Sequence, residues 1–204
     1  MPLLRKKIPK RRIVKEIVGD YRAHRKSLEE DFNHRCGYCD DIDIFKRAHY
    51  EIDHFIPKSF LKKIFPITEE YKNKEQEYSN LVYSCHFCNN AKGEEWPTGS
   101  MEIHNKDNTG FIDPCKSEYD NQFERNEKGE IIPKTELGKW IHKTLKLWKP
   151  EHSYIWHLNE LKQNIDEIKK IIDKKDTFER EKLEKLLYFF LNNYYEYHNQ
   201  LMEY

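Results

Sequence analysis

Two pairs of closely spaced cysteines constrain this chain more than any other feature. The pairs are Cys36-x2-Cys39 and Cys85-x2-Cys88, and a fifth cysteine, Cys115, stands alone. A Cys-x2-Cys segment offers two sulfurs to one metal ion, and a structural Zn²⁺ takes four such ligands in a tetrahedron. The two pairs therefore predict one zinc site that joins two distant segments of the chain.

The zinc prediction requires reduced thiols, and the sequence favours them. The apolar residues that follow the basic stretch, within 13–18, are interrupted by Lys15 and Glu16, so they do not form the apolar core of a secretory signal. No apolar run approaches the length of a transmembrane helix. We therefore expect a cytoplasmic protein without membrane contact, a compartment in which cysteines stay reduced and bind metal more readily than they form disulfides.

The charge of the chain is balanced overall but not locally. The 36 Lys and Arg residues match 36 Asp and Glu residues, so net charge gives no attraction to nucleic acid. Seven basic residues nevertheless precede the first acidic residue. They are Arg5, Lys6, Lys7, Lys10, Arg11, Arg12 and Lys15. This cluster indicates either a nucleic-acid-binding arm, in which Arg11 and Arg12 contact phosphate, or a solvated tail.

Apolar spacing predicts a mixed helix and strand pattern in the first half. Helical spacing extends over 13–33, and alternation ending at Pro57 predicts a strand over 50–56. Residues 80–84 fit a second strand, and 85–92 fit a helix that stops at Gly93. The connection over 58–79 is long and contains enough apolar residues for a brief helix.

The second half is mainly helical. A hairpin is expected over 122–132, and Thr135 is placed to cap a helix that Pro150 ends. Apolar residues from Ile155 to Leu201 repeat every three to four positions, which predicts two antiparallel helices that turn near 174–177. Aromatic residues cover more than one face of the last helix. They are Tyr188, Phe189, Phe190, Tyr194, Tyr195 and Tyr197. We expect self-association or partner docking there, the alternative being packing onto the rest of the chain.

Three segments that share the cysteines' region resemble the HNH nuclease motif in its zinc-bearing form. They are Glu51–Ser59, Ser79–Val82 and Cys85–Lys92. The resemblance implies an α+β fold with a zinc-stapled ββα-metal core. We expect that core over 36–115, after a basic arm and helix over 1–35 and before a mostly helical extension over 116–204.

The resemblance also implies roles for individual residues. His54 would be the general base that takes a proton from water, and Asn80 would tether the loop that orients it. Asp53 and Asn89 would hold a catalytic Mg²⁺ or Mn²⁺, although many members carry His where this chain has Asn89. Lys92 either contacts phosphate or is a solvated helix lysine. A regular strand would point Asp53 and His54 to opposite faces, so the motif alone does not explain how both reach one site.

Two downstream segments, 110–115 and 129–133, resemble small bacterial HNH proteins, in layout the PtuB-like nucleases of Septu and retron-associated antiphage systems. That resemblance implies a DNA endonuclease that acts in antiviral defence with a partner ATPase. An alternative is a zinc-stabilised module that binds nucleic acid without cutting it. Asp53, His54 and Asn89 would then be ordinary polar surface residues.

Overall fold

The computed structural model describes residues 3–14, 19–45, 49–66 and 68–203. The chain divides into two compact units, Met1–Trp148 and Lys149–Tyr204. Neither of the expected boundaries, after residue 35 and after residue 115, separates these units. The HNH-like core therefore shares one unit with both its flanking segments, up to residue 148.

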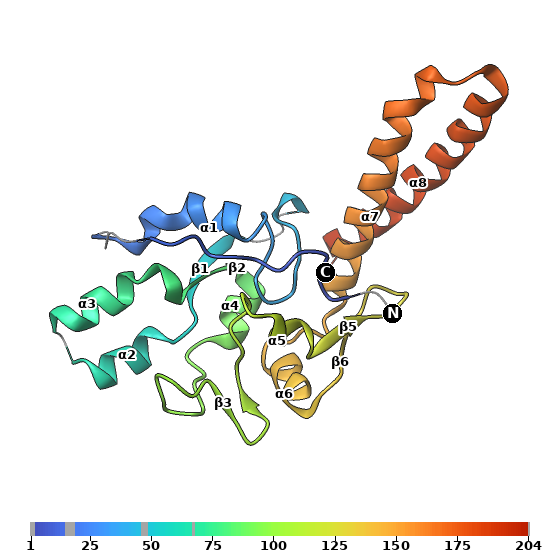
Figure 1. The fold of residues 1–204 in the computed structure, drawn as a ribbon. Helices are drawn as coiled ribbons and strands as arrows, with labels where there is room; N and C mark the ends of the chain where they lie inside the picture. The colour runs from blue at the N-terminus through green and yellow to red at the C-terminus, as the bar shows by residue number, and fades with distance from the viewer. Residues whose placement is uncertain (1–2, 15–18, 46–48, 67, 204) are drawn as a thin grey trace. The chain divides into compact units, whose positions relative to one another are not determined.

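The centre of the first unit is a strand–strand–helix arrangement (Figure 1). β1 (Tyr50–His54) pairs antiparallel with β2 (Leu81–Cys85), and α4 (His86–Lys92) follows directly. All five residues of β2 are buried, which makes this strand the centre of the unit's core. Gly93 ends α4 in the left-handed region, at φ +52°. The two predicted strands and the predicted helix are confirmed.

The N-terminal helix is shorter than expected. It consists of a 3-10 turn, η1 (Tyr21–His24), and α1 (Arg25–Asp31). The Asp20 side chain accepts a hydrogen bond from the Arg22 N–H and so starts the turn. The prediction of a helix from residue 13 is wrong at its beginning, where Ile13 is 90% exposed, and residues 15–18 lie outside the described part of the chain.

The long connection between the two strands is largely helical. It contains α2 (Lys58–Ile64), α3 (Glu69–Gln76) and a 3-10 turn, η3 (Tyr78–Asn80). Thr68 caps α3 by accepting from the Tyr71 N–H. α2 and α3 pack side by side, so the expected brief helix is a helix pair.

Short elements complete the first unit. In chain order they are η2 (Asp43–Phe45), β3 (Asn105–Lys106), β4 (Thr109–Gly110), α5 (Ser117–Asp120), β5 (Phe123–Arg125), β6 (Ile131–Pro133) and α6 (Glu136–Thr144). The hairpin and the Thr135 cap are confirmed, since Thr135 accepts from the Gly138 N–H. α6 ends before Pro150, because Lys146 is left-handed at φ +54° and the Leu147 N–H donates to the His142 carbonyl.

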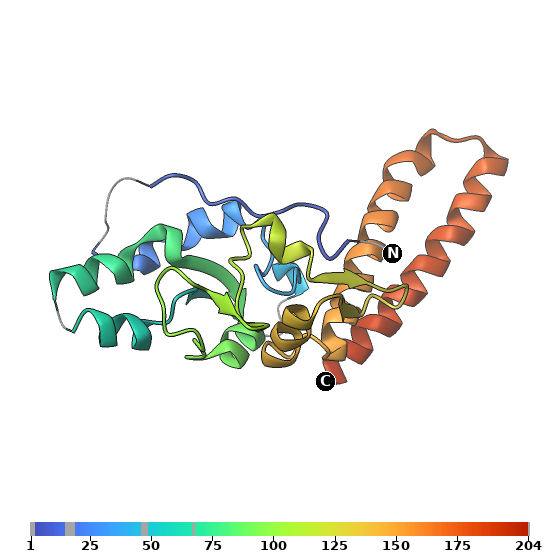
Figure 2. The same cartoon turned by 60° about the horizontal axis from the view of Figure 1, so that its bottom comes forward.

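The second unit is a helical hairpin. α7 (Pro150–Ile171) leads through a 3-10 turn, η4 (Ile172–Lys174), into α8 (Thr177–Glu203), and the two helices run antiparallel (Figures 1 and 2). This confirms the predicted pair. On α8, Tyr188, Phe189 and Tyr195 are 58–69% exposed. No helix in the described ranges is long and apolar enough to cross a membrane.

Candidate zinc and active sites

The four paired cysteines lie together. All four are buried and free of disulfides, and their sulfurs lie within 4.8 Å of one another. The Cys39 and Cys85 sulfurs are 3.8 Å apart. Tetrahedral Zn²⁺ with bonds of about 2.3 Å separates its sulfurs by about 3.8 Å, whereas a disulfide would join them at about 2.05 Å. The cluster could therefore hold one zinc ion, as the sequence predicts.

The backbone positions both pairs for this geometry. The Gly37 N–H donates to the Tyr83 carbonyl, which fixes the first turn against β2. A Cβ on Gly37 would lie 2.7 Å from the Phe32 ring and 2.8 Å from Val82, so glycine is required here by close packing. Cys85 ends β2 and accepts from the Cys88 N–H at 3.4 Å.

The electrostatics of the four thiols suit a cation. Burial alone would raise the pKa of Cys36, but hydrogen bonds with Cys39, Cys85 and Cys88 lower this pKa well below its ordinary value. The pKa values of Cys39 and Cys88 are raised well above the ordinary value, mainly by burial at Cys39 and by the contact with Cys36 at Cys88. Thiolates are the form of cysteine that binds metal, so a cation in the cluster would favour loss of the thiol protons.

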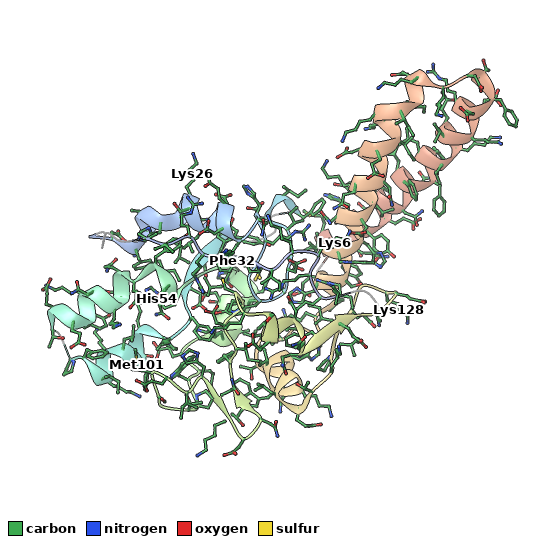
Figure 3. All side chains as sticks on the ribbon, viewed as in Figure 1. Lys6, Lys26, Phe32, His54, Met101 and Lys128 are labelled. Atoms are coloured by element: carbon green, nitrogen blue, oxygen red, sulfur yellow. The ribbon has the colours of Figure 1, made fainter. Side chains whose placement is uncertain are left out.

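His54 lies at the end of β1 (Figure 3). The Nε2 atom lies 2.8 Å from the backbone carbonyl of Glu75. A carbonyl only accepts, so Nε2 carries the proton and Nδ1 keeps a free lone pair. Burial lowers the pKa of His54, and nearby Lys58 lowers it further, against an opposing contribution from the Glu75 carbonyl. The ring of Tyr21 stands edge-on to the imidazole, with centroids 4.6 Å apart.

Asn80 binds the segment that follows His54. Its Oδ1 accepts from the Ile56 N–H at 2.8 Å, and its Nδ2 donates to the Ile56 carbonyl at 3.0 Å. The Phe55 N–H donates to the Asn80 carbonyl at 2.8 Å. Three hydrogen bonds thus hold the chain immediately beyond His54, which are the contacts expected of a tethering residue.

Asp53 points to the other side of β1 and is already paired. The Tyr38 hydroxyl donates to Asp53 Oδ2 at 2.5 Å, and Lys92 Nζ lies 3.1 Å from the same oxygen. Lys92 also donates to the His54 carbonyl at 2.9 Å. The Lys92 side chain is completely buried, so both expectations for it, a phosphate contact and a solvated surface lysine, are wrong for this structure.

Asn89 contacts a carboxylate that the sequence analysis did not single out. Its Nδ2 donates to Glu51 Oε2 at 2.5 Å, and His86 Nδ1 lies 2.9 Å from Glu51 Oε1. Burial alone would raise the pKa of Glu51, but hydrogen bonds from Asn89 and His86 lower it. Asn89 therefore meets Glu51 and not Asp53. The alternation of side-chain direction along β1 is the sequence signal for Glu51, because residues 51 and 53 share the strand face that α4 covers.

The two arginines assigned to nucleic acid make contacts within the protein. Arg11 donates to the Leu81 carbonyl at 2.6 Å and pairs with Asp113 at 2.8 Å. Its side chain is only 9% exposed, so the expectation that Arg11 contacts phosphate is wrong for this structure. Arg12 pairs with Asp31 and Glu30, and its side chain is 42% exposed. A nucleic-acid contact by Arg12 stays a prediction.

Residues 36–95, which contain the cysteines, β1, β2 and α4, match the sequence model of the HNH endonuclease family. The chain carries an HNH endonuclease domain. In an alignment 163 residues long that covers 72% of the chain, the sequence is 27% identical to the Septu protein PtuB of Bacillus mycoides (strain KBAB4). The alignment covers 51% of that protein, so the chain spans about half the length of this relative. No solved structure matches the chain. Both resemblances found in the sequence are confirmed.

Proposed function

We propose that this chain is an endonuclease that hydrolyses phosphodiester bonds in DNA, with His54 as the general base. The observation that carries the proposal is the hydrogen bond from His54 Nε2 to the Glu75 carbonyl. It leaves Nδ1 as the atom that accepts a proton. Burial lowers the pKa of His54, which keeps the imidazole neutral, and hence basic, at neutral pH.

The protein's own residues divide the work of proton transfer. His54 Nδ1 takes a proton from the water that attacks phosphorus, and the Glu75 carbonyl stabilises the imidazolium through Nε2–H. Asn80 keeps the segment after His54 in place through its two hydrogen bonds to Ile56. A positioned base of this kind contributes about 10² to 10⁴-fold to the rate.

We propose that Asp53 and Asn89 hold a divalent ion, Mg²⁺ or Mn²⁺, for which carboxylate and amide oxygens are suitable ligands. The bound ion supplies stabilisation for negative charge on the phosphate and the leaving oxygen. Glu51 joins this proposal, because its carboxylate lies against Asn89 on the same face of β1 as Asp53. Asp53 binds the ion only if Lys92 or Tyr38 gives up its contact.

A Mn²⁺ titration distinguishes the two carboxylates. We expect Asp53→Asn to weaken Mn²⁺ binding more than Glu51→Gln does, with zinc content unchanged in both. The reverse order would assign the ion to Glu51 and Asn89. Asn89→His should shift the preference towards softer ions such as Ni²⁺.

Plasmid nicking tests the activity itself. Protein that retains its zinc should convert supercoiled DNA to nicked or linear forms with Mg²⁺ or Mn²⁺, and a mild chelator should stop the reaction. The rival function, binding without cleavage, predicts that DNA is retarded on a gel but stays supercoiled under every metal condition. That outcome, with any required partner present, would refute the nuclease.

The likeness to a Septu protein supports a role as the nuclease subunit of an antiphage defence system in the cytoplasm, acting with an ATPase. We propose that α8 provides the docking or self-association surface, because Tyr188 and Tyr195 are more than two-thirds exposed. Replacing both tyrosines with serine should abolish co-purification with the ATPase, whereas Lys174→Ser, an exposed control in the same unit, should leave it intact. If the tyrosine variant still co-purifies with the ATPase, the partner binds to another surface.

A further inference from the structure

Three metal-ligating side chains meet in the first unit outside the sites described above. Glu29 comes from α1, His34 from the turn after it, and Asp43 from η2. We propose that they form a second metal site, which takes a first-row divalent ion such as Zn²⁺ and leaves the remaining coordination positions to water. This site is separate from both the cysteine cluster and the proposed catalytic ion.

The spacing of the ligand atoms fits a shared ion. His34 Nδ1 lies 3.4 Å from Glu29 Oε1 and 3.6 Å from Asp43 Oδ2. Both separations exceed the range of about 2.7–3.2 Å for N–H···O hydrogen bonds. Ligands about 2.1 Å from a tetrahedral ion lie about 3.4 Å from one another. The three groups are therefore spaced as co-ligands rather than as hydrogen-bond partners.

The backbone holds the three residues together before any ion binds. The His34 N–H donates to the Glu29 carbonyl at 2.8 Å, and the Asp43 N–H donates to the His34 carbonyl at 2.9 Å. His34 and the preceding Asn33 are left-handed, with φ of +59° and +55°. This conformation is uncommon for residues other than glycine, and here it turns the imidazole back towards α1.

The charge of the cluster is a second, independent indication of a cation. The Asp43 side chain is 5% exposed, and its Oδ2 accepts from the Tyr83 hydroxyl at 2.7 Å. Among the residues that the structure describes, its only ion-pair partner is His34, which is charged only when protonated. A buried carboxylate requires a compensating charge. With Glu29 beside it, a divalent ion would balance the charge of both carboxylates.

The mixed nitrogen and oxygen ligands indicate which ion binds and what it does. One imidazole with two carboxylates favours zinc, manganese, cobalt or nickel over Ca²⁺, which prefers oxygen alone. His34 precedes Cys36 by two residues, and Asp43 follows Cys39 by four. An ion here would fasten both ends of the first cysteine turn to α1.

Zinc stoichiometry of the full-length protein tests the proposal. After dialysis against micromolar free Zn²⁺, wild type should hold one more equivalent of zinc than His34→Gln. Adding Asp53→Asn to both proteins should not change that difference. His198→Gln is the matched control, since it removes an exposed imidazole on α8 and should lose no zinc. Equal zinc in wild type and His34→Gln would overturn the proposal.

A cobalt titration gives a readout that does not depend on the folding of one variant. Co²⁺ added to wild type that holds a single equivalent of zinc, in the cysteine cluster, should bind with visible bands but without thiolate charge transfer, because its ligands are nitrogen and oxygen. If His34→Gln does not fold, Glu29→Gln replaces it, since Glu29 is partly exposed, and should weaken Co²⁺ binding at least tenfold. Unchanged affinity in a folded variant would refute the site.

Discussion

Replacing Lys92 with methionine should destabilise the first unit strongly. The Lys92 ammonium is completely buried, 3.1 Å from the Asp53 carboxylate and 2.9 Å from the His54 carbonyl. Methionine has a similar length but no charge. Within the described part of the chain, the substitution leaves the buried Asp53 carboxylate with the Tyr38 hydroxyl as its only side-chain donor.

The expected cost follows from the uncompensated charge. Removing one partner of a buried ion pair costs about 3–5 kcal/mol, which in a unit of this size lowers Tm by roughly 6–20 °C. The double variant Lys92→Met with Asp53→Asn removes both charges. It should be more stable than the Lys92→Met variant by up to about 3 kcal/mol, which is the coupling energy of a contacting pair.

Urea unfolding followed by tryptophan fluorescence measures these differences, with free zinc held constant because bound metal adds to the apparent stability. Lys26→Met is the matched control, since Lys26 is an exposed lysine on α1 (Figure 3), and it should change the free energy of unfolding by less than about 0.5 kcal/mol. If Lys92→Met costs no more than Lys26→Met, the buried pair does not stabilise the unit.

Three further outcomes follow from the same geometry. Cys85→Ser should lose zinc and solubility together, because structural zinc binding is coupled to folding; a soluble variant with full zinc would contradict the four-cysteine site. Asn80→Ala should slow single-turnover cleavage with zinc retained, since it removes two hydrogen bonds to Ile56, and an unchanged rate would remove its tethering role. The cleavage rate should rise with pH along a limb centred below the ordinary histidine pKa of about 6.5, because burial lowers the pKa of His54 and only the unprotonated base reacts. A fall in cleavage rate towards acid pH that is centred above pH 7 would contradict a buried His54 as the base.

The parts of the fold that the sequence predicts are those set by local pattern. Alternation that stops at Pro57 predicts β1, and three-to-four-residue spacing predicts the α7–α8 pair. The cysteine pairs needed no knowledge of tertiary structure, because one ion with four ligands implies that the two distant segments meet. The motif put Asn80 at the start of the second strand, and the structure has it at the end of η3, one residue before β2.

Long-range pairing produced the differences. The sequence around Lys92 is typical of a polar surface helix. In the structure its ammonium is buried because it pairs with Asp53, 39 positions away. Arg11 reads as part of a basic arm until Asp113 pairs with it, 102 positions away. The end of α6 depends on Lys146 adopting a left-handed backbone, a conformation that its side chain does not signal.

Single-turnover DNA cleavage by His54→Ala, with zinc content and DNA affinity measured on the same sample, decides whether His54 is the general base. We expect a loss of about 10² to 10⁴-fold in rate, with zinc and DNA binding close to wild type, since His54 takes part in neither. The exposed-histidine control, His198→Ala, should cleave normally. If His54→Ala cuts as fast as wild type once contaminating nuclease is excluded, His54 is not the base and the proposed active site is wrong.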